Sequence, residues 1–355
     1  MNEELLTALA DICKEKGIER DVILDALEAA LVAAYKRNFA SAQNVEVQLD
    51  RTTGVVKVVA KKEVVELVED ENAQTMISLE DAKKISGIYE IGDIVDIEVT
   101  PRNFGRIAAM TAKQVITQRL REAERDMIYN EYTEKENEIV SAKVERIENG
   151  NVYVSIDKVP ATLPSREIPV TEQPASEHFK VHDWIRCYVS EVKNVSKGTQ
   201  IILSRTHPGL VKKLFMQEVP EIADGLVEIK SVSREAGSRT KIAVYSEDPN
   251  VDPQGACIGP NGLRVQRIGE ELKGEKIDIV KWSENPAEFI AASLSPSKVL
   301  SVTVNEEEKT ASVVVPDYQL SLAIGKAGQN VRLAARLTGW KIDITSAPED
   351  GFQAE

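Results

Sequence analysis

Two glycine pairs with the same spacing could bind a ligand through the backbone. The segment Ile258-Gly-Pro-Asn-Gly-Leu-Arg-Val265 aligns with Ile324-Gly-Lys-Ala-Gly-Gln-Asn-Val331 at an offset of 66 residues. Further along the chain, Lys276-Ile-Asp-Ile279 aligns with Lys341-Ile-Asp-Ile344 at an offset of 65 residues. Two matched anchors in each copy indicate an internal repeat in which a Gly-x-x-Gly (GxxG) loop occurs twice.

A GxxG loop between two short helices can hold a phosphodiester backbone. Glycine permits positive φ and lets another chain approach without a Cβ in the way. The helix that follows offers N–H groups and the positive end of its dipole. We expect Ile258 and Ile324 to anchor the loops in the core, and nearby Arg and Lys residues to supply positive charge. The predicted contact residues are Ile258, Gly259, Pro260, Asn261, Gly262, Arg264 and Arg267 in the first copy and Ile324, Gly325, Lys326, Ala327, Gly328, Gln329, Asn330, Arg332 and Arg336 in the second.

Other kinds of site find little support in the sequence. Neither loop has the Gly-x-x-x-x-Gly-Lys-Ser/Thr spacing of a nucleotide-binding P-loop. The three histidines, His178, His182 and His207, have no nearby cysteine to complete a metal site, and no Ser/His/Asp or Cys/His arrangement suggests catalysis. The three cysteines lie far apart, and we expect them to be reduced and buried. The sequence therefore predicts a binding protein without a metal or cofactor, not an enzyme.

Each GxxG loop lies in the same predicted order of elements, which is helix, strand, strand, helix, GxxG, helix, strand. In the first copy the helix and two strands before the loop are predicted at 210–222, 226–232 and 240–245. In the second copy they are predicted at 286–293, 299–304 and 310–315. The repeat therefore comprises whole domains, each with one loop.

Residues 137–206 have the pattern of a small β-barrel. Short strands are predicted at 138–147, 152–156, 184–192 and 200–204, and Asn149-Gly150 is a strong hairpin signal. A proline-rich stretch between the second and third strands is predicted to be a long loop. Four or five short strands in about seventy residues favour a closed barrel.

The first 131 residues are set apart by charge. Predicted elements are a helix at 19–38, a hairpin within 45–68, a strand at 94–99 and a long charged helix at about 109–132, which is typical of a connector between domains. This segment carries a net charge of −8, against −1 for 132–206 and −2 for 207–347. An acidic segment suits a basic protein partner, and it suits equally well a solvated surface that maintains solubility.

Nothing near the N-terminus resembles a signal peptide or a membrane span. Acidic residues precede any apolar run, and the longest uncharged apolar stretch there, 29–35, is far shorter than the about 20 residues that a bilayer requires. We expect a cytoplasmic protein without membrane contact.

Taken together, these segments resemble known families. The two repeats resemble type II KH domains, whose GxxG loop clamps about four nucleotides of single-stranded nucleic acid. Residues 137–206, with the runs at 184–192 and 197–205, resemble an S1-like OB fold. With further similar runs at 106–115, 237–244 and 328–334, the chain up to about residue 347 resembles the NusA family of bacterial transcription elongation, termination and antitermination factors.

The resemblance implies an α+β multidomain fold: an N-terminal α+β domain with the connector helix at 1–131, an S1-like OB-fold barrel at 137–206, KH domains at 207–281 and 282–347, and an acidic tail at 348–355. It implies that the first domain binds RNA polymerase near the RNA exit channel, at the flap of the β subunit. The barrel and KH domains would bind nascent single-stranded RNA. Pausing, intrinsic termination and antitermination would be modulated together with other Nus factors. We expect a monomer without the C-terminal acidic repeats of some family members.

Two other functions stay open on the sequence alone. An RNA-processing enzyme could use the S1-like and KH domains as accessories, but its site would have to lie in residues 1–131, which contain no histidine. A translation-associated RNA-binding protein would be expected to co-sediment with ribosomes instead of RNA polymerase.

Overall fold

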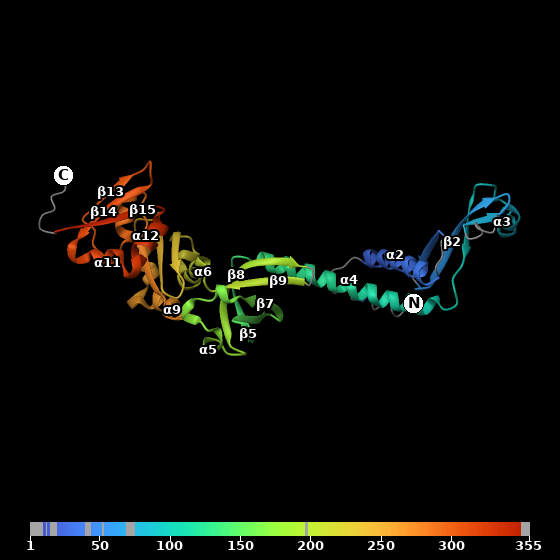
Figure 1. Cartoon of the computed structure of the whole chain (residues 1–355), viewed down its shortest axis with the longest axis horizontal. Helices are drawn as coiled ribbons and strands as arrows, with labels where there is room; N and C mark the ends of the chain where they lie inside the picture. The colour runs from blue at the N-terminus through green and yellow to red at the C-terminus, as the bar shows by residue number, and fades with distance from the viewer. Residues whose placement is uncertain are drawn as a thin grey trace. The chain divides into compact units, whose positions relative to one another are not determined.

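The computed structural model describes residues 10–11, 13–14, 20–39, 44–51, 53–68, 75–195 and 198–348 of the 355-residue chain (Figure 1). The chain forms two compact units, residues 1–128 and 129–355. The division between them falls within helix α4 (Phe104–Glu134), the long helix predicted from the sequence.

The first unit is organised around one long strand, β2 (Val56–Val65). It pairs antiparallel with β1 (Val45–Leu49), which confirms the predicted hairpin. It also pairs antiparallel with β4 (Ile94–Glu98) and parallel with β3 (Met76–Ser78). The resulting four-stranded sheet contains both antiparallel and parallel pairs, because β2 is long enough to pair with β1 near one end and with β3 near the other.

Helices pack on this sheet and form two separate hydrophobic cores with it. Helix α2 (Arg20–Phe39) buries its apolar face against β1, β2 and the first turns of α4. Helix α4 begins at Phe104, five residues before the predicted start, and the Phe104 side chain is buried in that core. Helix α3 (Leu79–Ile85), which was not predicted, closes a smaller core around Val64 and Val95.

Five strands of the second unit close into the predicted barrel, in the order β5-β6-β7-β9-β8. One pair, β7 with β9, is parallel, and the other four pairs are antiparallel. The strands are β5 (Ile139–Glu148), β6 (Asn151–Ile156), β7 (Val159–Leu163), β8 (Trp184–Val195) and β9 (Gly198–Ser204). A closed barrel of five strands is the OB-type architecture.

Strand β7 lies where the sequence predicted a loop. Pro160 lacks an N–H group and is rare inside sheets, which made this stretch look irregular. In the structure Pro160 faces Ser155 of β6, while the pairing of β7 with β9 involves only Ala161 and Thr162. The strand therefore tolerates the proline because no partner on the β9 side needs its missing N–H.

The repeat is confirmed as two units with the same topology. In the first repeat unit, β10 (Glu228–Glu235) pairs antiparallel with β11 (Arg239–Tyr245), and β11 pairs parallel with β12 (Lys276–Lys281). The second repeat unit has the same order in β13 (Ser301–Asn305), β14 (Thr310–Pro316) and β15 (Lys341–Ala347).

Helices of each repeat unit pack on its sheet, as α11 and α12 do in Figure 1. The helices of the first unit are α6 (Pro208–Glu218), α7 (Pro220–Ala223), α8 (Pro253–Ile258) and α9 (Leu263–Glu271). Those of the second are α10 (Pro286–Ser293), α11 (Leu320–Ile324) and α12 (Gln329–Thr338). The predicted first helix is broken in two at Val219, directly before Pro220.

Candidate nucleic-acid interface

The two GxxG loops have the same backbone conformation. Gly259 and Gly325 have φ/ψ of 74°/172° and 78°/170°. The second residue between the glycines is left-handed in both, with φ 52° at Asn261 and 51° at Ala327. The closing glycines, Gly262 and Gly328, have φ 74° and precede α9 and α12 directly. Two sequences that share only the glycines thus build one loop shape.

The first glycine of each loop is required for space as well as for φ. A Cβ on Gly325 would lie 2.8 Å from the backbone N of Asn330, and one on Gly259 would lie 2.6 Å from Cγ of Arg264. A Cβ on Gly262 would meet nothing within 4 Å. The loop is therefore drawn tightly onto the following helix at its first glycine and faces outward at its second.

The isoleucines before the loops do not anchor them, which corrects the sequence analysis. Ile258 and Ile324 are 40% and 36% exposed, whereas the preceding residues, Cys257 and Ala323, are completely buried. Helices α8 and α11 thus turn the smaller side chain inward. The two isoleucines instead form apolar surface beside each GxxG loop, where a base could lie.

Positive charge at the first loop is largely paired within the unit. The Arg264 guanidinium lies 2.9 Å from Glu221 and donates to the Ala256 carbonyl at 2.6 Å. Arg267 is more exposed and lies 2.8 Å from Glu218. The carboxylates of Glu221 and Glu218 therefore offset the positive charge of the two arginines. The exposed residues of the loop itself, Pro260 and Asn261, carry no charge.

At the second loop, two of the predicted contact residues reach back to the first repeat unit. The Arg332 guanidinium donates to the Glu235 carboxylate at 2.6 Å. The Gln329 side-chain amide donates to Glu235 at 2.9 Å and to the Ser238 hydroxyl at 2.7 Å. The hydrogen bond from Arg332 holds the pKa of Glu235 below its usual range. We call these four residues the Glu235 cluster.

The remaining predicted residues of the second loop divide into exposed and buried groups. Lys326, Ala327 and Arg336 are exposed or half-buried, so they can meet a ligand. Asn330 is buried, and its amide donates to the carbonyls of Leu294 and Ala323. Its side chain supports the loop from inside and does not face the ligand side, contrary to the sequence analysis.

The barrel carries a separate depression of about 890 Å³ between β6, β7 and β9. Tyr153 of β6 lines it, and the Arg146 guanidinium lies 4.3 Å from the Tyr153 ring centroid. Aromatic rings and arginines that stack on bases are common on surfaces that bind single-stranded nucleic acid, and here the Arg146 guanidinium already covers one face of the Tyr153 ring.

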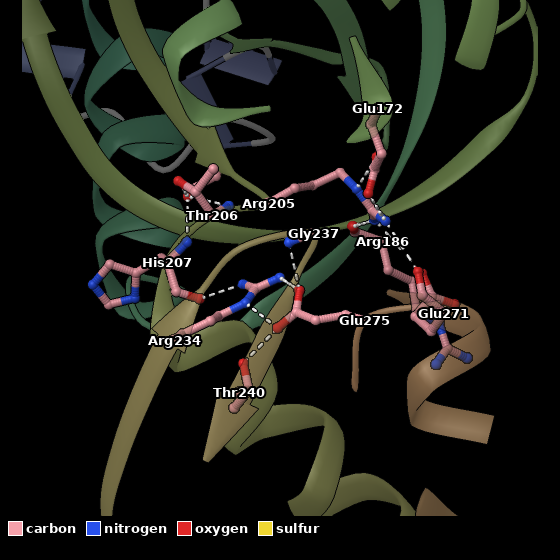
Figure 2. A network of polar contacts seen from close by, with 11 residues as sticks. Glu172, Arg186, Arg205, Thr206, His207, Arg234, Gly237, Thr240, Glu271 and Glu275 are labelled. Carbon is pink, nitrogen blue, oxygen red and sulfur yellow. Dashed lines mark hydrogen bonds and ion pairs between the residues drawn. The ribbon is translucent and has the colours of Figure 1, made fainter. Parts of the chain in front are cut away.

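Buried charges join the barrel to the first repeat unit (Figure 2). Arg205, directly after β9, donates to the Glu172 carboxylate of the barrel at 2.8 and 3.0 Å. It also donates to the carbonyls of Arg186 in β8 and Glu271 in α9. The side chains of Arg205 and Glu172 are only 3% and 2% exposed. Arg205 was not among the predicted functional residues, because its partners lie 19 to 66 residues away and no local pattern marks them.

A second buried pair lies close by in the same view. Arg234 of β10 donates to both carboxylate oxygens of Glu275 and to the His207 carbonyl. Glu275 also accepts hydrogen bonds from the Gly237 N–H and the Thr240 hydroxyl. The segment that links barrel and repeat unit is therefore fixed by hydrogen bonds from both sides.

Metal binding and thiol reactivity find no support in the described part of the chain. His, Cys, Asp and Glu side chains form no group there that could hold a metal ion. Burial raises the pKa values of Cys187 and Cys257 to about 12, which keeps both thiols protonated at neutral pH. Among the described helices, none combines the length and apolar composition needed to cross a membrane.

The fold and the repeated loops define a class of protein, which combines an S1-type barrel with two KH modules. Comparison with domain families agrees: residues 133–205 match the S1 RNA binding domain, 205–282 the NusA-like first KH domain and 286–350 the NusA-like second KH domain. Residues 4–126 match the NusA N-terminal domain.

Relatives match almost the whole chain. The transcription termination/antitermination protein NusA of Bacillus subtilis (strain 168) is 59% identical over 346 residues, covering 98% of this chain and 91% of that protein. The NusA protein of Thermus thermophilus is 41% identical, with coverage of 98% and 91%. The solved N-terminal domain of NusA from B. subtilis is 58% identical and covers 35% of this chain and 99% of its own, with a TM-score of 0.32. The identities to the two near-full-length relatives show that the chain belongs to the NusA family of transcription termination/antitermination factors.

Proposed function

We propose that this chain binds RNA polymerase through residues 1–131 and nascent single-stranded RNA through residues 137–347, with domain boundaries as predicted at 137–206, 207–281 and 282–347. By linking polymerase to its transcript it would modulate pausing, intrinsic termination and antitermination. It acts without catalysis, metal or cofactor, as a cytoplasmic monomer that cooperates with other Nus factors.

The shared conformation of the two GxxG loops is the observation that carries the RNA part of the proposal. Each loop exposes its backbone at the start of a helix, and no side chain caps α9 or α12. Exposed Ile258 and Ile324 lie next to the loops. Such a surface suits a sugar–phosphate chain held at the loop with a base over the isoleucine.

The polymerase part is supported by charge and by exposed apolar side chains. The segment 1–131 carries more than half of the net negative charge of the chain, so a basic partner fits it. Large exposed apolar residues also concentrate there, a common mark of protein contact sites. They are Leu67, Ile85, Ile88, Ile91 and Ile94. We propose the flap of the polymerase β subunit as the surface that they meet.

The RNA proposal is tested by placing charge in the loops. Pro260→Asp with Asn261→Asp, and separately Lys326→Asp with Ala327→Asp, put two carboxylates where the phosphodiester would lie. None of the four positions is buried, and aspartate tolerates the left-handed φ of Asn261 and Ala327. Repulsion of about 1 kcal/mol or more per pair at about 4 Å predicts at least about tenfold weaker RNA binding for each double variant.

The matched controls are Asn261→Gly and Ala327→Gly, which keep the loop conformation without new charge. They should bind RNA like the parent, and all variants should still bind RNA polymerase. If both aspartate variants stay folded by circular dichroism and bind RNA like the parent, the loops are helix–helix turns and the RNA proposal is wrong.

The polymerase proposal is tested by pull-down of RNA polymerase with the full chain and with a chain that lacks residues 1–131. Ile88→Ser and Ile91→Ser, made singly, should each weaken the pull-down, whereas Val22→Ser, a single apolar-to-polar change at an exposed position of α2, should not. Retention by the shortened chain, or ribosomes in place of polymerase, would overturn the assignment. RNA cleavage in magnesium or manganese would show an enzyme.

A further inference from the structure

A tryptophan is exposed at the junction of the barrel and the first repeat unit. Trp184, the first residue of β8, is 66% exposed and lines a depression of about 540 Å³. His178 lines it from the barrel side, and Arg267, Glu270 and Lys273 line it from α9 and the turn that follows. The four-residue GxxG loops and the Tyr153 surface of the barrel do not line this depression, although Arg267, a predicted contact residue of the first loop, does.

A second depression borders the first. It measures about 600 Å³ and lies between α9 and β12 in the first repeat unit, where Val265 and Ile277 line it. Glu270 and Lys273 line both depressions. Helix α9 begins at the GxxG loop and ends near these two residues, so a strand held at the loop and lying along α9 reaches Trp184.

The charges of the junction fit a base better than a second phosphate. Glu271 lies 3.6 Å from Arg205, whereas Glu270 accepts a hydrogen bond from the neutral Gln266 amide, which leaves its negative charge uncompensated by that contact and disfavours a phosphate there. Lys273 is exposed at the rim, and the described residues offer it no ion-pair partner. A neutral base can stack on the indole while its phosphate stays outside near Lys273.

We propose that Trp184 stacks on a nucleobase of single-stranded RNA where the strand passes from the first repeat unit toward the barrel. The proposal rests on the RNA-binding function proposed above and adds a contact outside the GxxG loops. RNA is favoured over a peptide because the Trp184 depression shares Glu270 and Lys273 with the depression between α9 and β12, beside the helix that follows the GxxG loop. Stacking would be tolerant of sequence, since every base has a flat face.

The test measures binding of the full chain to single-stranded RNAs of increasing length. Trp184→Ala should weaken binding of long RNAs about tenfold or more, and should leave unchanged the binding of RNAs too short to pass beyond the loops. Trp184→Phe should restore most of the affinity, because a ring remains. Val170→Ala, an exposed apolar position on the same barrel outside the depression, should behave like the parent.

Fluorescence gives a second readout. The chain has three tryptophans, and Trp340 is buried. Long RNA should quench the parent, and Trp184→Phe should lose most of that quenching. If Trp184→Ala binds all RNAs like the parent while the loop variants do not, the Trp184 inference is wrong and the RNA proposal stands. If the parent binds no RNA, both are wrong.

Discussion

Single residues set the shape of the two GxxG loops. Gly325 and Gly328 both need positive φ, but only Gly325 also lies against backbone atoms of the next helix. We therefore expect Gly328→Ala to cost about 1 kcal/mol of unfolding free energy, from left-handed strain alone. Gly325→Ala should cost about 1–3 kcal/mol more, because its Cβ must displace backbone.

Chemical denaturation of the two variants, followed by circular dichroism, measures the difference. Gly259→Ala is the control in the first unit, where the added Cβ meets a flexible arginine side chain and the cost should be intermediate. Equal losses at Gly325 and Gly328 would show that the close approach is not a constraint.

His207 provides a test of protonation at the domain junction. Burial lowers its pKa from about 6.5, and Nδ1 accepts a hydrogen bond from the Gly209 N–H while the ring stacks on Tyr188 at 4.5 Å. Because the unfolded chain binds the proton more readily, stability should fall as pH drops below about 6.5 and level off below the folded pKa.

The measurement is an NMR titration of the His207 ring together with unfolding at several pH values. His207→Asn keeps a residue that caps α6 and removes the titration, so its stability should depend less on pH. A His207 pKa of 6.5 or higher in the folded chain would contradict the expectation.

Whole elements are positioned by the charges between them. Arg205 holds the end of β9, the Glu172 segment and the end of α9 together, all within a buried site. Arg205→Ala leaves Glu172 buried without its partner, and we expect a loss of about 3–5 kcal/mol. Arg205→Met with Glu172→Gln removes both charges and should recover much of it. Equal losses in the two variants, measured by urea unfolding, would argue against a desolvated ion pair.

The Glu235 cluster connects elements of the two repeat units. Apolar residues of both units, including Val280 and Phe289, pack together in a core of their own, so the cluster adds to a formed contact. We expect Glu235→Arg or Arg332→Glu alone to weaken binding of RNAs that span both loops several-fold. The double exchange should restore part of it, because the pair is remade with reversed charge. If the double exchange binds RNA no better than Arg332→Glu does, Arg332 contacts RNA directly and does not act through Glu235.

At the scale of the whole molecule, an acidic protein has to bind a polyanion. The chain carries −14 overall, so we expect RNA affinity to depend on a few local cations. We expect affinity to fall with salt with a slope of about −1.4 to −2.8, which corresponds to roughly two to four phosphates at about −0.7 each. Lys326→Ala should reduce the slope by about 0.7. Arg267→Ala should change it less, because Glu218 already pairs with that guanidinium. A slope near zero would show that backbone and apolar contacts dominate.

Much of the architecture could be predicted from the sequence because it is encoded by local patterns. Alternating apolar residues marked β1 and β2, and the matched GxxG anchors revealed the duplicated units and the position of their loops. Strand β7 was missed because Pro160 obscured a pattern that only pairing with β6 makes regular. Local patterns therefore predicted those helices and strands whose own apolar residues repeat with the period of a helix or a strand.

The tertiary structure decided which side chains are buried, which are exposed and which distant partners they meet. Ile258 is exposed and Cys257 buried, Asn330 points inward, and Arg332 meets Glu235 from 97 residues away. The amino-acid order alone was enough to predict two GxxG loops in matched positions, because the glycine spacing is a local pattern that permits positive φ. Only the folded chain decided how the loops, the barrel and their charges meet, because those contacts join residues that no short-range pattern links.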